Sequence, residues 1–210
     1  MIKSIGVQEI SLSSFCDWPG CISHVIYIGS EDKNIYGCNW KCPTCHNKSL
    51  SWQPTGKANI NIQYIIEKLN LHKKYINKIT ITGGEPTLCP NLYNLIKELN
   101  QNSFNKICIH SNGSNLNSIK ELIDSIELFC IDIKGPFKKY PELTGIKNMS
   151  IDKISNTILD LLNFAKKYKE KFYFRTTKVP ILTNDDLIET EKLVNSFNFP
   201  LHLQEYRNIK

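Results

Sequence analysis

The chain has 210 residues, a length that suits one domain of ordinary to large size with a substantial buried core. Its composition, 41% hydrophobic and 22% charged residues, is typical of a globular protein. The stretch MIKSIGVQEI has neither the apolar core nor the cleavage site of a signal peptide, and no apolar run reaches about 18 residues. The sequence therefore predicts no membrane segment and a cytoplasmic location.

The formal net charge of +6 is spread along the chain. Lysines occur singly or in short groups such as HKK, FKKY and AKKYKEK, without the regular interleaving of aromatic residues that marks a nucleic-acid surface. This pattern favours a solvated, lysine-rich surface. A nucleic acid is therefore not the expected partner.

Hydrophobic periodicity predicts six strands that alternate with five helices. In chain order, the strands are expected at residues 24–29, 78–83, 106–111, 128–133, 171–179 and 199–206. The helices are expected between them, at residues 60–72, 91–102, 115–125, 151–169 and 184–197. This alternation is typical of successive right-handed βαβ units around a mainly parallel sheet. Because no linker or repeat interrupts the pattern, we expect a single domain over residues 1–210.

Unusual polar and glycine motifs accompany the predicted strands. The stretch GCNWKCPTCHN follows the first strand, GGEP the second, SNG the third and DIKGP the fourth, and Arg175 lies within the fifth. In parallel α/β sheets, functional groups gather at the carboxyl ends of the strands. We therefore expect one site at one edge of the sheet, which combines three thiols and two glycines with Glu85, Asn112, Lys134 and Arg175.

Three of the eight cysteines, Cys38, Cys42 and Cys45, form a CxxxCxxC motif. In a reducing compartment this cluster predicts metal ligands rather than disulfides. The scattered cysteines are expected to be small hydrophobic residues, and they are Cys16, Cys21, Cys89, Cys108 and Cys130. Because none of them forms a second CxxC, the sequence predicts one metal site.

Two kinds of metal site agree with this spacing. Three thiolates, with His46 as a fourth ligand, would suit a structural zinc site, although adjacent residues are poorly placed for one tetrahedron. An iron–sulfur cluster is the alternative, because soft thiolates select it and three cysteines leave one of four irons open. The spacing alone favours neither.

The CxxxCxxC motif, followed downstream by a strand that ends in GGEP, resembles the radical S-adenosylmethionine (SAM) superfamily. Further matches at DWPG, ITGGEPTL, DIKGPFKKYPELTG and FRTTKVPIL are similar to the activating proteins of anaerobic ribonucleoside-triphosphate reductases, and more loosely to other glycyl-radical-enzyme activases. The resemblance runs from about residue 8 to residue 206. It implies one [4Fe-4S] cluster on Cys38, Cys42 and Cys45, with SAM as the ligand of the fourth iron.

The resemblance also implies roles for the GGEP residues. Gly83 and Gly84 would let the backbone approach the methionine part of SAM, because they lack side chains. Glu85 would accept a hydrogen bond from the SAM ammonium, directly or through a neighbouring group. The alternative for this motif is a plain turn from strand to helix.

Three further positions are assigned to SAM by the same resemblance. Lys134 and Arg175 would bind its carboxylate, although both could instead form ordinary surface ion pairs. Asn112, together with Gly113, would lie near the ribose or the methionine, although an Asn-Gly pair is also simply a favourable turn.

The sequence departs from the family pattern in three places. Thr44 stands before Cys45 where an aromatic residue is usual, which removes an expected contact to adenine. His110 and Ser111 replace an Asp-Thr pair, so a monovalent-cation site that would combine this Asp with Asp132 loses one ligand. The stretch IGSEDKNIYGCN is longer than the usual connection to the first cysteine.

We expect an α/β fold with an incomplete (β/α)6 barrel, since a full eight-stranded barrel needs about 250 residues. The resemblance implies reductive cleavage of SAM, with the 5′-deoxyadenosyl radical taking a hydrogen from a glycine of an anaerobic ribonucleotide reductase. An electron donor such as flavodoxin or ferredoxin is implied as well. Alternatives are an activase of the pyruvate formate-lyase type, a radical SAM enzyme acting on a small molecule or RNA, and a zinc-binding interaction module.

Overall fold

The computed structural model describes residues 5–57 and 59–207. One seven-stranded sheet forms its centre, with its strands in the chain order β1 to β7. The strands are β1 (Ile5–Trp18), β2 (Cys21–Ser30), β3 (Lys78–Gly83), β4 (Lys106–Ser111), β5 (Leu128–Asp132), β6 (Phe172–Lys178) and β7 (Leu201–Glu205). Strands β2 to β7 are parallel, and β1 pairs with β2 in the antiparallel direction.

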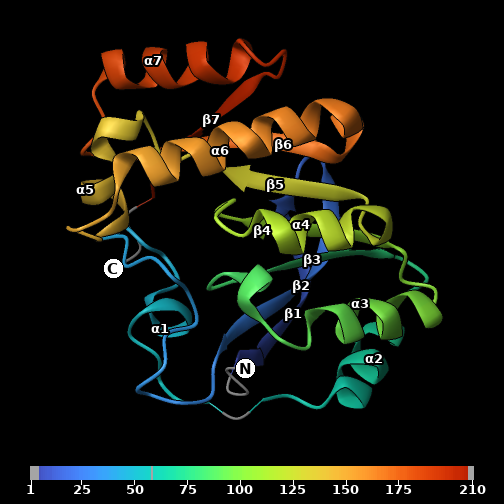
Figure 1. Ribbon diagram of the computed structural model, residues 1–210. Coiled ribbons are helices and arrows are strands. Elements are labelled where there is room, and N and C mark those ends of the chain that lie inside the picture. The colour runs from blue at the N-terminus through green and yellow to red at the C-terminus, as the bar shows by residue number, and fades with distance from the viewer. Residues whose placement is uncertain (1–4, 58, 208–210) are drawn as a thin grey trace.

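The helices connect the parallel strands in the predicted alternation. They are α1 (Lys48–Ser51), α2 (Ile62–Asn70), α3 (Leu92–Gln101), α4 (Leu116–Leu122), α5 (Tyr140–Thr144), α6 (Ile151–Ala165) and α7 (Asn184–Asn195). Figure 1 shows α3, α4, α6 and α7 stacked in chain order along one side of the sheet. The predicted six parallel strands and five helical connections are thus confirmed, with the short helices α1 and α5 added in the loops.

Strand β1 is the element that periodicity did not predict. Its pairing with β2 contains three register shifts, between Val7 and Glu9, between Ser11 and Ser14, and between Ser14 and Trp18. Such irregularities interrupt the regular alternation of side chains between the two faces of the sheet, so the alternation of apolar and polar residues is lost. The strand therefore has no regular pattern in the sequence, although it is the longest in the sheet.

The predicted helix ends differ from the observed ends by a few residues. The segment predicted at 151–169 is α-helical only to Ala165, and a 3₁₀ helix with a kink at Tyr168 follows it. Helix α7 begins at a capping box, in which Thr183 and Asp186 satisfy each other's backbone N–H groups. Such ends depend on local hydrogen bonds more than on periodicity.

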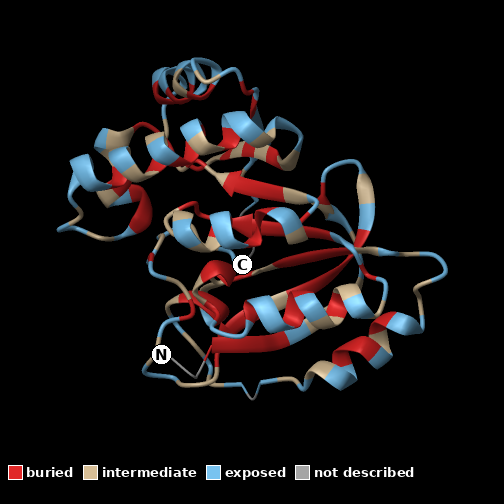
Figure 2. Cartoon of the chain, turned by 45° about the vertical axis from the view of Figure 1, so that its right-hand side comes forward, coloured by how far each residue is buried: buried red, intermediate tan, exposed pale blue. Residues whose placement is uncertain are grey.

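The hydrophobic core lies between the sheet and the helices. Figure 2 shows the central strands buried over most of their length and the helices buried along one side, whereas β1 and β7 at the two ends of the sheet are largely not buried. The apolar stripe of α3 is built from Leu92, Leu95, Ile96 and Leu99, and all four side chains are buried. The helices therefore cover one face of the sheet.

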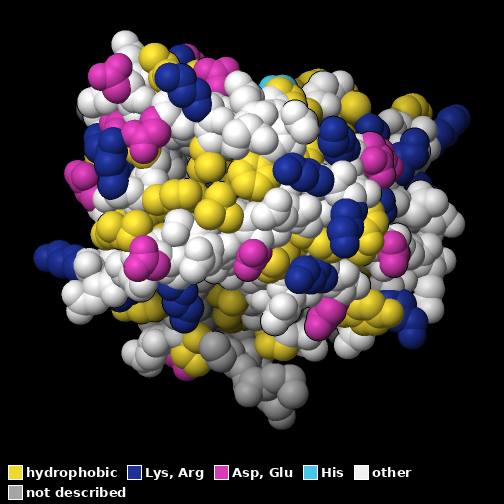
Figure 3. Space-filling model, turned by 45° about the horizontal axis from the view of Figure 1, so that its top comes forward, with side chains coloured by type: hydrophobic (Ala, Val, Ile, Leu, Met, Phe, Trp, Pro, Cys, Tyr) yellow, Lys and Arg dark blue, Asp and Glu magenta, His cyan; other side chains and the backbone are white. Residues whose placement is uncertain are grey.

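The sheet is not closed into a barrel in the part of the chain that the structure describes, since β1 and β7 stand at its two ends. This confirms the expected incomplete barrel. Among the described residues, no helix has the length and hydropathy needed to cross a membrane. On the face in Figure 3, lysine and arginine side chains are interspersed with acidic and hydrophobic ones.

Candidate functional site

A cavity of about 700 Å³ opens at the carboxyl ends of the parallel strands. It has lining residues from every one of these six strands or from the loops that follow them. All nine residues that the sequence assigned to the site line it, and they are Cys38, Cys42, Cys45, Gly83, Gly84, Glu85, Asn112, Lys134 and Arg175. The structure therefore brings the predicted set together.

The cysteine loop after β2 is held by backbone hydrogen bonds from three directions. The Gly37 N–H donates to the carbonyl of Ser51 at 2.7 Å, and the Gly37 carbonyl accepts from the Glu85 N–H at 2.8 Å. The Lys41 N–H donates to the carbonyl of Thr144 at 2.7 Å. The loop is thus fixed to α1, to the GGEP turn and to α5, so the three thiols have a defined position at the cavity wall.

Burial makes two of these thiols hard to ionise on their own. It raises the pKa of Cys38 to about 12, and the negative charge of Glu85 adds to this effect. Burial also raises the pKa of Cys42, although the Lys134 charge opposes the shift. A metal centre supplies the positive charge that such thiols lack, since a coordinating thiol is deprotonated outright. The donor set therefore fits a metal cluster better than a free nucleophile.

The thiols of Cys38, Cys42 and Cys45 do not form, together with His46, a set of ligand atoms close enough to bind one metal ion. Among the described residues, one group of three possible metal ligands has all its ligand atoms within 4.8 Å of one another. Its members are Cys108, His110 and Cys130, so neither the motif thiols nor His46 belong to it. The His46 ring instead stacks on Tyr206, with 5.3 Å between ring centroids. A single zinc ion needs close tetrahedral ligands, whereas a four-iron cluster holds its thiolates farther apart. The geometry favours the cluster.

The two glycines of GGEP have a packing reason in addition to the expected one. A Cβ at Gly84 would lie 2.2 Å from the carbonyl oxygen of Gly37, in the cysteine loop. A Cβ at Gly83 would lie 2.2 Å from the carbonyl oxygen of Ile28, and Gly83 has a φ of +120°. The residues therefore allow β3 to approach β2 and the cysteine loop closely.

Glu85 is buried and joins the GGEP turn to the SNG turn. Its Oε1 accepts from the Thr87 N–H at 3.2 Å, from the Thr87 hydroxyl at 2.6 Å and from the Ser111 hydroxyl at 2.8 Å. Its Oε2 accepts from the Asn112 N–H at 2.7 Å. Burial raises the pKa of Glu85, while these hydrogen bonds oppose the shift. Most of its accepting capacity is used within the protein, so contact with a ligand through Asn112 is the better supported alternative.

Replacing Glu85 by alanine is expected to lower the free energy of unfolding by about 2–6 kcal/mol. The buried N–H groups of Thr87 and Asn112 would lose their acceptor, at a cost of about 1–3 kcal/mol each. Denaturant unfolding measures the change. Glu121→Ala is the matched control, because Glu121 is exposed and its removal should change stability by less than about 0.5 kcal/mol. Equal stability of the two variants would contradict this role of Glu85.

Asn112 reaches from the SNG turn to the cysteine loop. Its side-chain amide donates to Asn39 Oδ1 at 2.9 Å and lies 3.8 Å from Cys38 Sγ. Gly113 is not among the residues that line the cavity. A Cβ at this position would lie 2.7 Å from the side chain of Leu161 in α6, and the φ of Gly113 is +74°. Of the Asn-Gly pair, Asn112 therefore contacts the site and Gly113 serves the turn.

Two cations and one carboxylate line the cavity at the ends of β5 and β6. Arg175 Nε donates to Asp132 Oδ1 at 2.6 Å, and Lys134 Nζ lies 3.2 Å from Asp132 Oδ2. Burial opposes ionisation of Asp132, but the charges of Arg175 and Lys134 outweigh it and hold its pKa well below the usual range. The group has one more positive than negative charge, which suits a carboxylate of a bound ligand.

This arrangement bears on the expected monovalent-cation site. Both carboxylate oxygens of Asp132 already face protein cations. His110, which occupies the position where the resemblance implied an Asp, lies 3.3 Å from Arg175 Nη2 through its Nδ1 and contacts the Asp17 carbonyl through its Nε2. Arg175 and Lys134 thus supply the positive charge that a metal cation would bring.

The cavity also includes residues that the sequence analysis missed. Asp17 lies at the end of β1, and Leu203 and Gln204 lie on β7. The pattern of LHLQE could not have selected both β7 residues, because Leu203 and Gln204 are adjacent and successive side chains of a strand point to opposite faces. Asp17 belongs to the DWPG motif, which the sequence analysis quoted without giving this residue a place in the site.

Comparison with known proteins agrees with this site. The sequence model of the radical SAM superfamily matches residues 35–194, which include the cysteine loop and β3 to β6. The chain belongs to the radical SAM superfamily. As a radical SAM enzyme it uses a [4Fe-4S] cluster and SAM, and the donor set of the cavity fits both groups.

Two relatives of this radical SAM enzyme come from Methanocaldococcus jannaschii, and each is named "Putative glycyl-radical enzyme activating enzyme". They are 32% and 30% identical to this chain, over 90% and 88% of its length and 74% and 70% of theirs. The crystal structure of Streptococcus suis SuiB bound to precursor peptide SuiA has a TM-score of 0.63 at 17% identity. That likeness covers 82% of this chain but only 37% of SuiB, and it concerns the fold.

Proposed function

We propose that this radical SAM enzyme activates a glycyl-radical enzyme by removing a hydrogen atom from a glycine Cα of that partner. The observation that carries the proposal is the 32% identity, over 90% of the chain, to a protein named as an activating enzyme of this kind. A single cavity that contains three thiols and an excess of positive charge supports it. The proposed unit is one radical SAM domain over residues 1–210.

In this proposal Cys38, Cys42 and Cys45 bind the [4Fe-4S] cluster. When bound, the reduced cluster supplies one electron to the SAM sulfonium, which yields methionine and the 5′-deoxyadenosyl radical that takes the hydrogen. The protein contributes position and exclusion of water. Trp40, buried against Tyr140 with 5.9 Å between ring centroids, belongs to the apolar cluster against which Cys38 and Cys42 pack.

In this proposal the group of Lys134, Arg175 and Asp132 orients SAM. Lys134 and Arg175 bind the SAM carboxylate, and Asp132 keeps both cations in place between the ends of β5 and β6. Asn112 acts near the cluster, because its amide already lies beside Cys38. Glu85 positions Asn112 through the backbone hydrogen bond described above. Gly83 and Gly84 keep the floor of the cavity free of side chains.

The open side of the sheet supports a protein substrate. The cavity extends to β7, where Leu203 is 43% exposed and Gln204 and Glu205 are exposed as well. On the other side it reaches Cys16 at the end of β1, which is also exposed. A loop of a partner protein can enter between these two edges, so its glycine can come within a few ångströms of the reacting group.

The partner in this proposal is an anaerobic ribonucleoside-triphosphate reductase, as the motifs DIKGPFKKYPELTG and FRTTKVPIL suggest. The electron comes from a donor such as flavodoxin or ferredoxin, because the sequence has one CxxxCxxC motif and no second cluster motif. The proposed location is the cytoplasm, where thiols stay reduced.

A reductase prepared with α-deuterated glycine tests the proposal. Incubation with the reduced, cluster-loaded enzyme and SAM should transfer deuterium to 5′-deoxyadenosine, which mass spectrometry detects. The unlabelled reductase should then give an electron paramagnetic resonance doublet, because the remaining α-hydrogen couples to the radical. The same reductase with its radical glycine replaced by alanine is the control and should give neither signal.

Other outcomes identify other functions. A glycyl radical on a formate-lyase-type enzyme, but not on the reductase, would move the partner assignment to that enzyme. Modification of a small molecule or an RNA, with no glycyl radical on either protein, would refute activation of a glycyl-radical enzyme. The radical SAM assignment would stand in both cases.

A further inference from the structure

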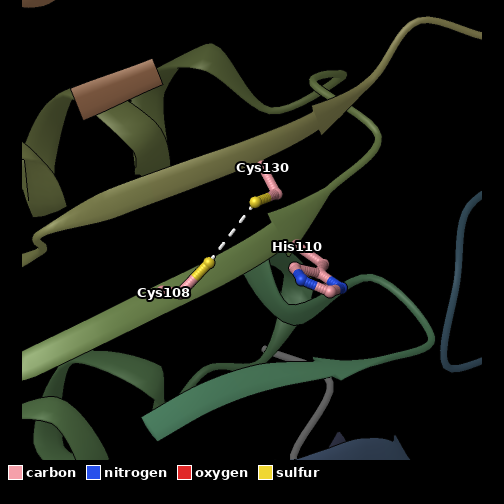
Figure 4. Close-up of side chains that lie close together, drawn as sticks. All are labelled: Cys108, His110 and Cys130. Carbon is pink, nitrogen blue, oxygen red and sulfur yellow. Dashed lines mark hydrogen bonds between the residues drawn. The ribbon is translucent and has the colours of Figure 1, made fainter. Parts of the chain in front are cut away.

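A second group of cysteine and histidine side chains lies on β4 and β5, and one of its members, His110, also lines the cavity. The ligand atoms of Cys108, His110 and Cys130 all lie within 4.8 Å of one another. The two sulfur atoms are 3.5 Å apart. Figure 4 shows the two thiols facing each other across the strands, with His110 beside them. Both thiols are fully buried, and His110 is 6% exposed.

We propose that Cys108, His110 and Cys130 bind one zinc ion, separate from the cluster of the radical SAM site. Two thiolates and one imidazole are ligands that zinc prefers, and they leave a fourth position for water or another donor. The separation of the two sulfur atoms is close to the distance of about 3.8 Å between two thiolates of a tetrahedral zinc site with 2.3 Å bonds.

The strand register argues against a disulfide between the same thiols. Cys108 pairs with Leu128, and Cys130 pairs with His110, so the two cysteines are offset by two residues. With a rise of 3.3 Å per residue and 4.8 Å between strands, their α-carbons are about 8 Å apart. A disulfide needs its α-carbons within about 7 Å. A metal ion bridges the two sulfur atoms without this constraint.

The hydrogen bonds of His110 leave the correct nitrogen for a metal. Its Nε2 lies 2.7 Å from the carbonyl oxygen of Asp17, and this oxygen can only accept. Nε2 therefore carries the ring proton, and the Nδ1 lone pair is available. Metal-binding histidines usually donate their other N–H to a carbonyl or carboxylate in this way. Arg175 Nη2, 3.3 Å from Nδ1, is the contact that a zinc ion would replace.

Charge and surroundings agree with the assignment. Two thiolates neutralise a zinc ion, so the ion adds no net charge to this buried region, and Arg175 keeps Asp132 as its partner at 2.6 Å. Trp18 and Tyr173 pack around the thiols and provide an apolar shell.

Such an ion would fix the floor of the cavity. His110 is followed directly by Ser111 and Asn112, and Asp132 lies two residues after Cys130. A bond from each strand to one ion would therefore hold the SNG turn at a constant distance from the Asp132 group. The role is structural, and it does not depend on which partner protein the enzyme activates.

Metal analysis of the cluster-loaded protein tests this proposal. After treatment with a chelator and addition of Zn²⁺, the protein should contain one zinc per chain beside about four irons. Cys108→Ala, His110→Ala and Cys130→Ala should each lose the zinc and keep the irons, which shows that they fold. Cys89→Ala, which removes another buried thiol, is the matched control and should keep both metals.

A second measurement uses Co²⁺ in place of Zn²⁺. The wild-type protein should show thiolate-to-cobalt charge-transfer bands and the visible bands of tetrahedral cobalt, and Cys130→Ala should lack both. If wild-type protein with its irons binds no more zinc than Cys130→Ala does, the proposed site does not exist. A Cys108–Cys130 disulfide formed in the folded protein under mild oxidation would also overturn the proposal.

Discussion

Replacing Cys38, Cys42 or Cys45 by alanine is expected to abolish both the iron–sulfur cluster and the cleavage of SAM. The three thiols line one cavity, and a [4Fe-4S] cluster with only two protein ligands loses much of its binding energy. Each variant, reconstituted without oxygen, should fall from about four irons per chain to background. Production of 5′-deoxyadenosine from SAM should fall with it.

Cys89→Ala is the control for this experiment. Its thiol is buried and donates to the Ile5 carbonyl, and Cys89 is not among the residues that line the cavity. The variant should keep its iron and its SAM cleavage. A chain that lacks one of the three motif cysteines but still binds about four irons would contradict the ligand assignment, as would wild-type protein that takes up no iron.

Replacing Lys134 or Arg175 by alanine is expected to weaken SAM binding while the cluster remains. A charge-assisted hydrogen bond to the SAM carboxylate contributes about 1.5–3 kcal/mol, which corresponds to roughly 10- to 150-fold in the dissociation constant. Both cations also share Asp132, at 2.6 and 3.2 Å, so either variant leaves Asp132 with one partner. Each substitution should therefore remove positive charge from the SAM site and lower the affinity for SAM.

Equilibrium binding of SAM to the reconstituted variants measures this effect, and iron content checks the cluster. Lys138→Ala is the matched control, because Lys138 forms an exposed pair with Glu189 and does not line the cavity. Its SAM affinity should equal that of the wild type. Unchanged affinity in both Lys134→Ala and Arg175→Ala would remove these residues from the SAM site.

The site was predictable because it depends on strand order rather than on side-chain detail. Parallel strands bring their carboxyl ends to one edge, so motifs at those ends must meet once the strands are assigned correctly. Cys38, Glu85 and Arg175 are far apart in sequence, yet they line one cavity. The hydrogen bonds that define their roles were not predictable, because they depend on distances of a few tenths of an ångström.

Two other features could not have been obtained from periodicity. Strand β1 has no regular alternation, since three register shifts interrupt its pairing. The meeting of Cys108 with Cys130 depends on how β4 and β5 are aligned, and the sequence of either strand does not specify this register. Both features arise from relations between strands, whereas periodicity describes one strand at a time.

The antiparallel pairing of β1 with β2 also has a consequence for the order in which the sheet can assemble. Only Pro19 and Gly20, whose φ is +71°, separate these strands, whereas residues 31–77 separate β2 from β3. The loss of chain entropy on closing a loop grows with its length, and contacts between distant residues form slowly. The β1–β2 hairpin is therefore the pairing with the smallest closure cost in this sheet, and it presents β3 with an edge that is already formed.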